Sequence, residues 1–301
     1  MHGLWSYPGI AARKAFAGRI PFMVFPHGML DPYFKRAFPL KHVKKLPFWM
    51  IAEYWNLRRA DRVLFTTALE RDLAAESFPW MHRWIPEVTA LGTTPPPAEA
   101  EHLRGVFHAA FPELAGKRFL LYLGRIHPKK GADLLLDAFT KLAPQHPEIH
   151  LVMAGPGADE EWASSLRATL TPEVASRIHW PGMLEGELKW GAFAASEAFA
   201  LPSHQENFGI AVVEALASAK PVLITHPVNI SPEIEADGAG LVAQDTPQGI
   251  QKMLSAWLAL SPEKRATMGQ QALATYAERY DMRRNTAPIL RLVETLRNKT
   301  P

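Results

Sequence analysis

The second half of the sequence alternates apolar segments of strand length with longer segments of helical periodicity, and this alternation restricts the possible folds most strongly. Short apolar runs bounded by turn residues predict strands at residues 119–123, 149–154, 177–180, 198–201, 221–225 and 240–242. Strands that alternate with helices along a chain form parallel sheets with right-handed crossover connections. The sequence therefore predicts an α/β fold whose main sheet is parallel.

The first part of the sequence shows the same alternation over fewer segments. We expect strands at 20–25, 62–66 and 88–91 and helices at 47–60 and 68–77. Pro47 suits the first turn of the earlier helix. A proline-rich stretch at 92–97 interrupts the pattern, and such stretches are stiff and extended. We therefore predict two domains, 1–112 and 113–301, with a final helix at 280–296.

Two glutamates eight residues apart follow the predicted strand at 198–201. Glu206 lies in a short loop that contains Gly209, and Glu214 lies about two turns into the apolar helix that follows. The first turn of a helix presents N–H groups without carbonyl partners, so it favours anions. The arrangement suits a ligand with phosphates and sugar hydroxyls, although a glutamate at such a position also serves as a cap or stays solvated.

A second polar loop follows the predicted strand at 119–123. Arg125 and Lys130 lie in it, with Gly124 and Gly131 at its two ends. Glycine permits a tight turn and a close approach of the backbone to a ligand. Open α/β sheets bind ligands at the carboxyl ends of their strands, and two cations there suit a diphosphate. The alternative for either cation alone is an ordinary surface charge.

Together these segments resemble the retaining glycosyltransferases of family 4, which have the GT-B fold. The resemblance rests on Gly-Arg and Lys-Gly at the ends of the first loop, on E-x7-E with N-F-G-I inside it, and on Ala-Ser-Ala-Lys-Pro-Val before a further strand. It implies two Rossmann-like parallel-sheet domains, the first one incomplete. It also implies that the final helix crosses back to the first domain.

The resemblance implies roles for the residues that would surround the donor diphosphate. Arg125 and Lys130 would hold the nucleotide diphosphate and stabilise the leaving group. Glu206 would contact the hydroxyls of the donor sugar. The backbone around Gly124 would approach the ligand closely. The amides that would meet the phosphates belong to Asn207, Phe208, Gly209 and Ile210.

Further matching residues would contact the rest of the donor. Glu214 would accept hydrogen bonds from the ribose hydroxyls. Met183 and Leu184 match the loop that contacts the base, although Met183 is also a candidate for packing. Near the start, Pro26-His27-Gly28 resembles the family's loop whose histidine faces the transferred sugar. The alternative for His27 is a hydrogen bond to a local backbone group.

The implied reaction transfers a hexose-type sugar from a nucleotide-diphosphate sugar to a hydroxyl of a glycan or a lipid-linked acceptor, with retained configuration, as in polysaccharide biosynthesis. The sequence contains no Asp-x-Asp, no His-Glu-x-x-His and no cysteine, so we expect neither a metal ion nor another cofactor. One alternative is a catalytically silent nucleotide-sugar-binding remnant or one half of a split enzyme. Another is a sugar-nucleotide epimerase.

The beginning of the chain departs from the family pattern. The family's first domain opens with a strand and a glycine-rich loop, whereas His2-Gly3-Leu4-Trp5 resembles the middle of that domain. Since a βαβ unit takes about 30 residues, we expect a complete domain to need about 60–90 more. A truncation, a split gene or a loss of activity would each account for the difference.

The net charge of +3 is unevenly distributed along the sequence, and the first 62 residues are strongly basic. Residues 1–62 carry eleven Lys and Arg against three acids, a charge of +8, which leaves −5 for the remaining chain. The basic clusters flank an apolar, aromatic stretch at 48–55, which suits either an anionic membrane surface or a core helix with a solvated end. No nucleic-acid-binding motif accompanies the charge, so no nucleic-acid partner is expected.

Without a membrane span or a signal peptide in the sequence, we expect a cytoplasmic protein. Peripheral contact with the inner face of the cytoplasmic membrane is the alternative interpretation of the basic first part.

Overall fold

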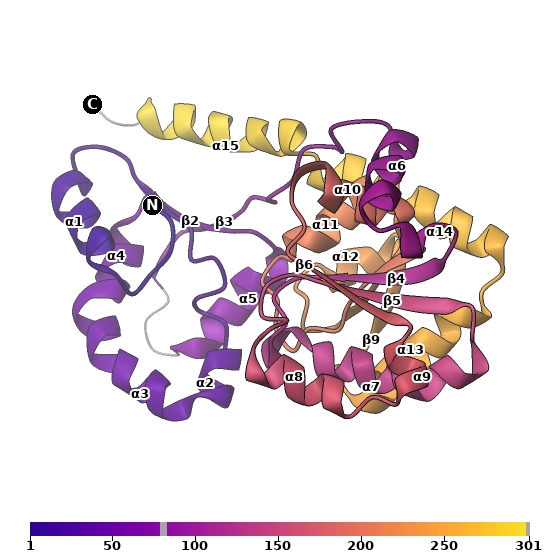
Figure 1. Ribbon diagram of the computed structural model, residues 1–301. Helices are drawn as coiled ribbons and strands as arrows, with labels where there is room; N and C mark the ends of the chain where they lie inside the picture. Colours follow the sequence, from indigo (N-terminus) through magenta and orange to yellow (C-terminus); the bar gives the residue numbers. More distant parts are fainter. Residues whose placement is uncertain (79–82, 299–301) are drawn as a thin grey trace. The chain divides into compact units, whose positions relative to one another are not determined.

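The computed structural model describes residues 1–78 and 83–298. The chain forms two compact units, one of Met1–Leu91 with Met282–Pro301 and one of Gly92–Asp281. Each unit contains a parallel sheet covered by helices (Figure 1). The predicted fold class, α/β with two parallel sheets, is confirmed. The units divide after Leu91, ahead of the predicted boundary at residue 112, because α6 (Ala100–Ala110) packs against α10 (Gly186–Ala195) of the second unit.

The second unit is built on a six-stranded parallel sheet with the strand order β6-β5-β4-β7-β8-β9. Its strands are β4 (Arg118–Leu123), β5 (Ile149–Ala154), β6 (Ile178–Gly182), β7 (Ala198–Leu201), β8 (Val222–Thr225) and β9 (Gly240–Ala243). The chain proceeds outward from β4 to β6, returns to β7 beside β4, and then proceeds to the other edge. The direction reverses between β4 and β7, and sheets of this kind bind ligands at the carboxyl ends of the strands on either side of such a reversal.

Helices cover both faces of this sheet (Figure 1). On one face α6 packs against α10, and α11 (Ile210–Ala217) packs against α14 (Pro262–Thr275). On the other face α7 (Ala132–Leu142) packs against α13 (Pro247–Ala259). The remaining helices are α8 (Glu161–Ala168), α9 (Pro172–Ala175) and α12 (Ser231–Ala236). Because both faces are covered, the central strands are apolar on both sides, and all four residues of β7 and of β8 are buried.

The first unit contains a smaller parallel sheet, β1-β2-β3 in the described residues. Its strands are β1 (Met23–Val24), β2 (Arg62–Phe65) and β3 (Pro86–Val88). The segment at residues 1–3 runs parallel to Phe25 beside β1, with hydrogen bonds from Gly3 N to Phe25 O and from Phe25 N to Met1 O. The helices are α1 (Tyr7–Phe16), α2 (Tyr33–Ala37), α3 (Pro39–Phe48), α4 (Tyr54–Arg59), α5 (Ala68–Ser77) and α15 (Met282–Arg297).

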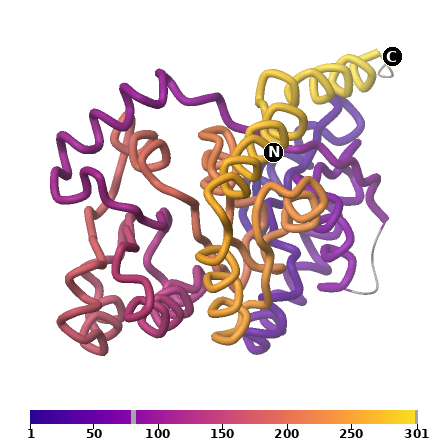
Figure 2. Tube along the Cα trace, turned by 90° about the vertical axis from the view of Figure 1, so that its right-hand side faces the viewer, coloured from indigo at the N-terminus to yellow at the C-terminus, as the bar shows by residue number. Residues whose placement is uncertain are grey.

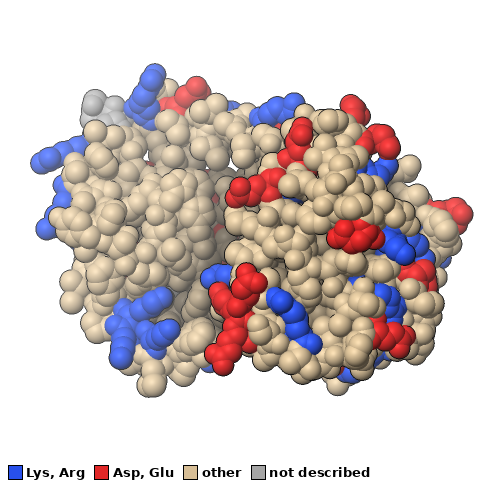
Figure 3. All heavy atoms as spheres, viewed as in Figure 1, with Lys and Arg blue, Asp and Glu red and all other residues tan. Residues whose placement is uncertain are grey.

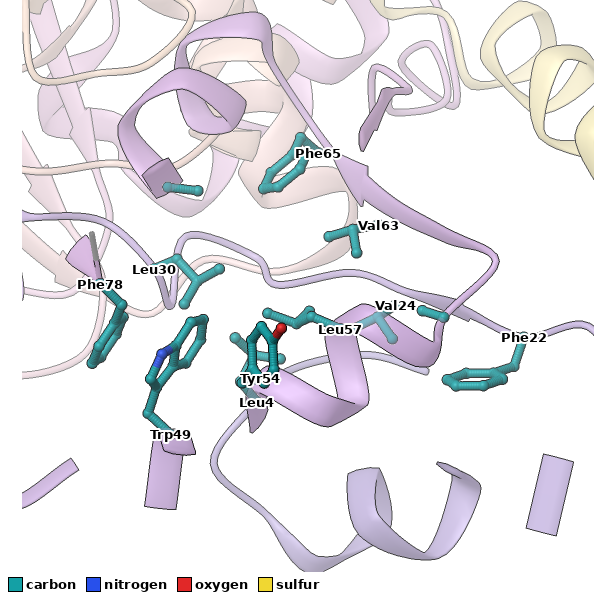
Figure 4. Packing of buried hydrophobic residues seen from close by; sticks show 12 residues of the cluster. Leu4, Phe22, Val24, Leu30, Trp49, Tyr54, Leu57, Val63, Phe65 and Phe78 are labelled. Atoms are coloured by element: carbon teal, nitrogen blue, oxygen red, sulfur yellow. The ribbon is translucent and has the colours of Figure 1, made fainter. Parts of the chain in front are cut away.

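The core of the first unit joins the sheet to its helices (Figure 4). Val24 and Val63 of the strands pack with Leu57 of α4, and all three are fully buried. Trp49 stacks on Phe78 with the ring centroids 4.3 Å apart. Burial of aromatic side chains of this size supplies much of the apolar area that stabilises a small core.

The helical stretch after α2 differs from the prediction for residues 47–60. Helix α3 already begins at Pro39, so Pro47 lies inside a helix rather than at its first turn. A single π-helical turn, Trp49–Glu53, follows and leads directly into α4. Proline lacks an N–H group and so removes one regular helical hydrogen bond, and the π turn directly after α3 is a second irregularity in the same stretch.

Most of the other predicted elements agree closely with the structure, but the strand predicted at 88–91 lies at 86–88, and only residues 23–24 of the stretch predicted at 20–25 form a strand. The strands predicted at 149–154 and 198–201 have the bounds of β5 and β7, and the final helix predicted at 280–296 is α15. This helix belongs to the first unit, and Figure 2 shows the yellow end of the trace beside the indigo and purple segments. Asn285 Nδ2 donates to Leu91 O at 2.9 Å within that unit. No helix within 1–78 or 83–298 has both the length and the apolar character that crossing a bilayer requires.

Candidate functional site

The loop after β4 turns tightly against the ends of the neighbouring strands. A short 3-10 turn, Pro128–Lys130, ends at Gly131, whose φ is 67°. A Cβ atom on Gly131 would lie 1.9 Å from the carbonyl oxygen of Pro202, directly after β7. Only glycine fits here, because a side chain would overlap backbone and φ is in the left-handed region. This contact holds the Lys130 turn against the β7 loop.

Lys130 and Glu206 form an ion pair between the Nζ and Oε2 atoms. Their side chains are 20% and 18% exposed, so the pair is partly shielded but open to a ligand on one side. The two residues come from the loops after β4 and β7, the strands between which the chain reverses direction. The sequence predicted that these two side chains converge, and the structure brings them together.

The backbone of the Glu206 loop is fixed by hydrogen bonds from three directions. His204 N and Ser203 Oγ both donate to Lys129 O at 3.0 Å. Glu206 N donates to Pro227 O, and Asn229 N donates to Glu206 O, each at 3.0 Å. The position of the Glu206 carboxylate is therefore set by the loops after β4 and β8 as well as by its own strand.

The first turn of α11 faces the same edge of the sheet. Gly209 precedes the helix with a φ of 77°, and no side chain caps the helix. The first amides, those of Ile210 and Ala211, have no carbonyl partner within the helix, so they are available to an anion. Phe208 is buried with its ring edge-on to Tyr280 at 5.7 Å, which anchors the turn. Asn207 Oδ1 lies 3.5 Å from Asn229 Nδ2.

Glu214 forms a second ion pair, which sequence reasoning missed. Its Oε1 accepts a 2.7 Å hydrogen bond from Nζ of Lys189, a residue of α10. Glu214 is buried at 8% exposure, so a cation beside it offsets the cost of removing the carboxylate from water. No pattern in the sequence indicated this pair, because Lys189 lies in α10 and Glu214 lies in α11.

Met183 and Leu184, both predicted near the base, differ in exposure. The Met183 side chain is 65% exposed, so it does not serve the packing role considered for it, whereas Leu184 is buried. Gly182 is the last residue of β6 and has a φ of 74°. Its carbonyl oxygen accepts a 2.8 Å hydrogen bond from Gly155 N. The loop thus presents an exposed thioether and backbone groups at the carboxyl end of β6.

Arg125 extends from the loop as an exposed side chain, with no ion pair among the residues that the structure describes. Its backbone is fixed instead, because the hydroxyl of Tyr122 donates to Arg125 O at 2.7 Å. Burial raises the pKa of Tyr122 far above its usual value; the charges of Glu206 and Asp133 add to the rise, and that of Arg125 opposes it. Tyr122 is therefore a permanent donor, and it lies within electrostatic reach of both Arg125 and Glu206. Gly124 N donates to Ala154 O at 3.0 Å and ties this loop to β5.

His27 lies in the first unit, in a turn with a φ of 51° at the histidine itself. Its Nε2 is 2.8 Å from Nδ1 of His2, so its partner is a side chain rather than the local backbone group considered for it. Burial and then His2 lower the pKa of His27, and Glu70 opposes them. Glu70 accepts from Gly28 N at 2.6 Å and so supports the turn. The ring of His27 is thus held neutral and oriented.

Lys130, Glu206 and the first turn of α11 lie together at the carboxyl ends of β4 and β7. Cations and unpaired helix amides favour an anion such as a diphosphate, and carboxylates accept hydrogen bonds from hydroxyls. Within the described residues, no group of three or more His, Asp or Glu side chains is arranged to hold a metal ion.

Comparison with known proteins identifies the family of this chain. Residues 106–275 match the family described as "Glycosyl transferases group 1", and residues 1–86 match the "Glycosyl transferase 4-like domain". Mannosylfructose-phosphate synthase of Agrobacterium fabrum is 29% identical over 243 residues, which is 73% of this chain and 52% of the relative. Phosphatidyl-myo-inositol mannosyltransferase of Mycolicibacterium smegmatis is 29% identical over 184 residues, 60% of this chain and 45% of the relative. The chain spans about half the length of the curated relatives that it matches.

Solved structures share the fold at lower sequence identity. Sucrose-phosphate synthase from Thermosynechococcus elongatus superposes with a TM-score of 0.78 at 20% identity, covering 96% of this chain and 71% of that one. HepE of Anabaena, in complex with UDP and glucose, gives 0.76 at 18% identity, covering 95% and 74%. The predicted GT-B fold is confirmed. Because the group 1 match covers more than half of the sequence, this chain belongs to the group 1 glycosyl transferase family.

Proposed function

We propose that this protein is a glycosyltransferase that moves a hexose-type sugar from a nucleotide-diphosphate sugar to a hydroxyl acceptor with retention of configuration. The observation that carries the proposal is the Lys130–Glu206 ion pair beside the first turn of α11, at the carboxyl ends of β4 and β7. Support comes from HepE, a structure of the same fold that was solved with UDP and glucose.

In this proposal the cations act on the leaving group. As the bond between the sugar and the diphosphate breaks, negative charge grows on the phosphate oxygens. Lys130, Arg125 and the amides of Ile210 and Ala211 stabilise that charge more strongly than the charge of the bound donor. One well-placed donor of this kind is worth about 3 kcal/mol of barrier. Because these groups supply the electrostatic stabilisation themselves, we propose that the reaction needs no divalent metal ion.

The carboxylates act on hydroxyls. Glu206 accepts hydrogen bonds from the hydroxyls of the donor sugar. Its ion pair with Lys130 holds the ammonium group next to the phosphate that leaves. Glu214 accepts from the ribose while Lys189 balances its charge from the other side. Met183 and Leu184 contact the base, and neutral His27 contacts the transferred sugar. Retention is carried over from the family, and the one-bond coupling between C1 and H1 of the product would test it.

The proposal is tested by calorimetry with UDP and GDP beside a turnover assay with their hexose conjugates. A transferase binds one of the two diphosphates and turns over its conjugate, and turnover persists in EDTA. A silent remnant binds the same diphosphate and gives no product under conditions in which a full-length relative does. An epimerase alters the donor without any acceptor. Loss of turnover in EDTA, restored by a divalent ion, would contradict the metal-independent chemistry.

A second observation concerns the acceptor. Helix α3 and the π turn after it present an outward row of apolar side chains at helical spacing, Leu40, Val43, Met50 and Ile51. Leu40 is 79% exposed and Ile51 is 75% exposed. Lys and Arg side chains gather over α2 and α3 (Figure 3), and Lys41 and Lys44 lie on the same helix as Leu40 and Val43. Exposed apolar residues flanked by cations suit an anionic lipid surface, so we propose a lipid-linked acceptor and peripheral contact with the membrane.

Replacing Leu40 and Ile51 together with aspartate is expected to weaken binding to vesicles of anionic phospholipid by tenfold or more, since each side chain contributes about 1.5–3 kcal/mol when buried in lipid. Co-sedimentation with anionic and with neutral vesicles measures the effect. The matched control replaces Leu290 and Val293 of α15, also exposed, with aspartate. An equal loss in both double variants, or no preference for anionic vesicles in the unaltered protein, would contradict the membrane surface.

A further inference from the structure

A cavity of about 730 Å³ lies at the amino ends of the strands of the main sheet, whereas the proposed donor site lies at their carboxyl ends. Its wall includes Arg118 at the start of β4, Glu197 directly before β7 and Lys220 before β8. The end of α13 and the exposed side of α14 complete it with Arg265 and apolar residues. A volume of this size is in the range that holds a small molecule.

Three cations line this cavity against one carboxylate. Glu197 is already occupied, because Arg118 binds it at 2.6 and 3.2 Å and Arg265 Nη1 lies 3.4 Å from both of its oxygens. Glu148 lies 3.3 Å from Arg118 at the exposed rim and is not part of the wall. The wall therefore keeps an excess of positive charge after its internal ion pairs are formed.

Lys220 is the least satisfied of the three cations. Its Nζ donates to Ala194 O at 2.9 Å and to Ser196 O at 2.8 Å, which uses two of its three N–H groups. No other acceptor within the described residues takes the third. Burial lowers the pKa of Lys220 to about 8, and Arg104 adds to this effect while Glu197 opposes it, so the ammonium persists at neutral pH without a full set of partners. An anion would complete its hydrogen bonds.

Arg265 adds a second guanidinium to the wall. It lies over the ring of Trp257, 5.2 Å from the centroid, and its Nη2 donates to Leu258 O at 2.9 Å, so its position is fixed. The remaining wall contains Pro221, Leu260, Pro262 and Leu273, which favour contact with an apolar face such as a sugar ring. The combination of cations at the base and apolar walls above them suits a phosphate ester better than a free inorganic ion.

We propose that this cavity binds a small phosphorylated molecule, separately from the donor site, with its phosphate on Lys220, Arg118 and Arg265. The site lies at the amino ends of β4, β7 and β8, whereas Arg125, Lys130 and Glu206 follow the carboxyl ends of β4 and β7. The two sites therefore share strands but no residue. Occupation of one leaves the cations of the other free.

The experiment titrates inorganic phosphate and glucose 6-phosphate into the full chain and follows binding by calorimetry and by the phosphorus NMR signal. Lys220→Met removes the ammonium and keeps most of the stem, and Ala266→Trp fills the cavity while all of its charges remain. Each is expected to weaken binding of glucose 6-phosphate by tenfold or more, the usual result of losing a charged hydrogen bond or the space for the ligand. Lys264→Met, on the same helix but outside the wall, is expected to change nothing.

The affinities for the two probes and the behaviour of the variant Lys130→Ala distinguish the possible binding sites and ligands. Tighter binding of glucose 6-phosphate than of phosphate supports a phosphate ester as the ligand, and equal affinities overturn that part. Lys130→Ala is expected to leave binding at the cavity intact. If binding is lost in Lys130→Ala and retained in Ala266→Trp, the phosphate was in the donor site and the cavity proposal is wrong, while the proposed function stands. Ala266→Trp keeps the Lys220 hydrogen bonds, so it decides the matter even if Lys220→Met fails to fold.

Discussion

Lys130→Ala is expected to lower the rate of sugar transfer by about 10²–10³-fold, the effect of removing one donor that stabilises a developing oxyanion. The same change is expected to weaken binding of the nucleoside diphosphate by about tenfold to a hundredfold, because a hydrogen bond to a charged group is worth about 1.5–3 kcal/mol. It also leaves the partly buried carboxylate of Glu206 without its cation. Both consequences act at the phosphate end of the donor.

The measurement compares the affinity of the variant for the nucleoside diphosphate with its affinity for the free nucleoside. A phosphate role predicts a large loss for the first and little change for the second. Lys141→Ala is the matched control, since Lys141 forms an exposed surface pair with Asp137 on α7 and lies outside the proposed site. Equal losses for diphosphate and nucleoside would show that Lys130 supports the fold of the loop rather than the ligand.

Gly131→Ala is expected to destabilise the second unit by about 3 kcal/mol or more and to abolish transfer. The added Cβ would lie 1.9 Å from Pro202 O, and alanine would have to adopt a φ of 67°. The turn must therefore move away from the end of β7. This movement separates Lys130 from Glu206 and removes the ion pair on which the proposed site depends.

Gly105→Ala is the matched control, because the same chemical change is made where nothing opposes it. Gly105 lies within α6, and its added Cβ would meet no atom within 4 Å. Alanine is the better helix former there, so stability is expected to rise by about 0.5–1 kcal/mol. Denaturant unfolding of both variants measures the expected loss of stability in Gly131→Ala and the expected gain in Gly105→Ala. A Gly131→Ala protein as stable and active as the unaltered chain would show that the Lys130 turn is not held in this way.

Much of the second unit follows from the sequence because its strands are buried on both faces. Continuous apolar runs between helical segments have few other solutions, so β5 and β7 were predicted with their observed bounds. The loops that follow β4 and β7 could also be placed, since parallel strands end at the same edge of a sheet. The meeting of Lys130 and Glu206 was implied by the resemblance to the family, because the common end of parallel strands does not show that β4 and β7 are neighbours.

The partners of buried charges were less accessible to prediction. Nothing in the sequence near Glu214 indicates that Lys189 neutralises it, because the two residues meet only when α10 and α11 pack on the same face. The same holds for His2 and His27, which are far apart in the sequence and adjacent beside β1. Pairs of this kind depend on packing between elements, and local propensity carries no information about it.

The sequence by itself determined the parallel α/β fold, the order of its strands and helices in the second unit, and the loops that carry the polar residues, because periodicity and turn residues act locally. Tertiary structure alone decided that Lys189 faces Glu214, that Pro47 lies inside a helix just before a π turn, and that cations surround a cavity at the amino ends of the strands. These features arise when separate elements exclude water from each other, and the free energy of a buried charge depends on every group that surrounds it.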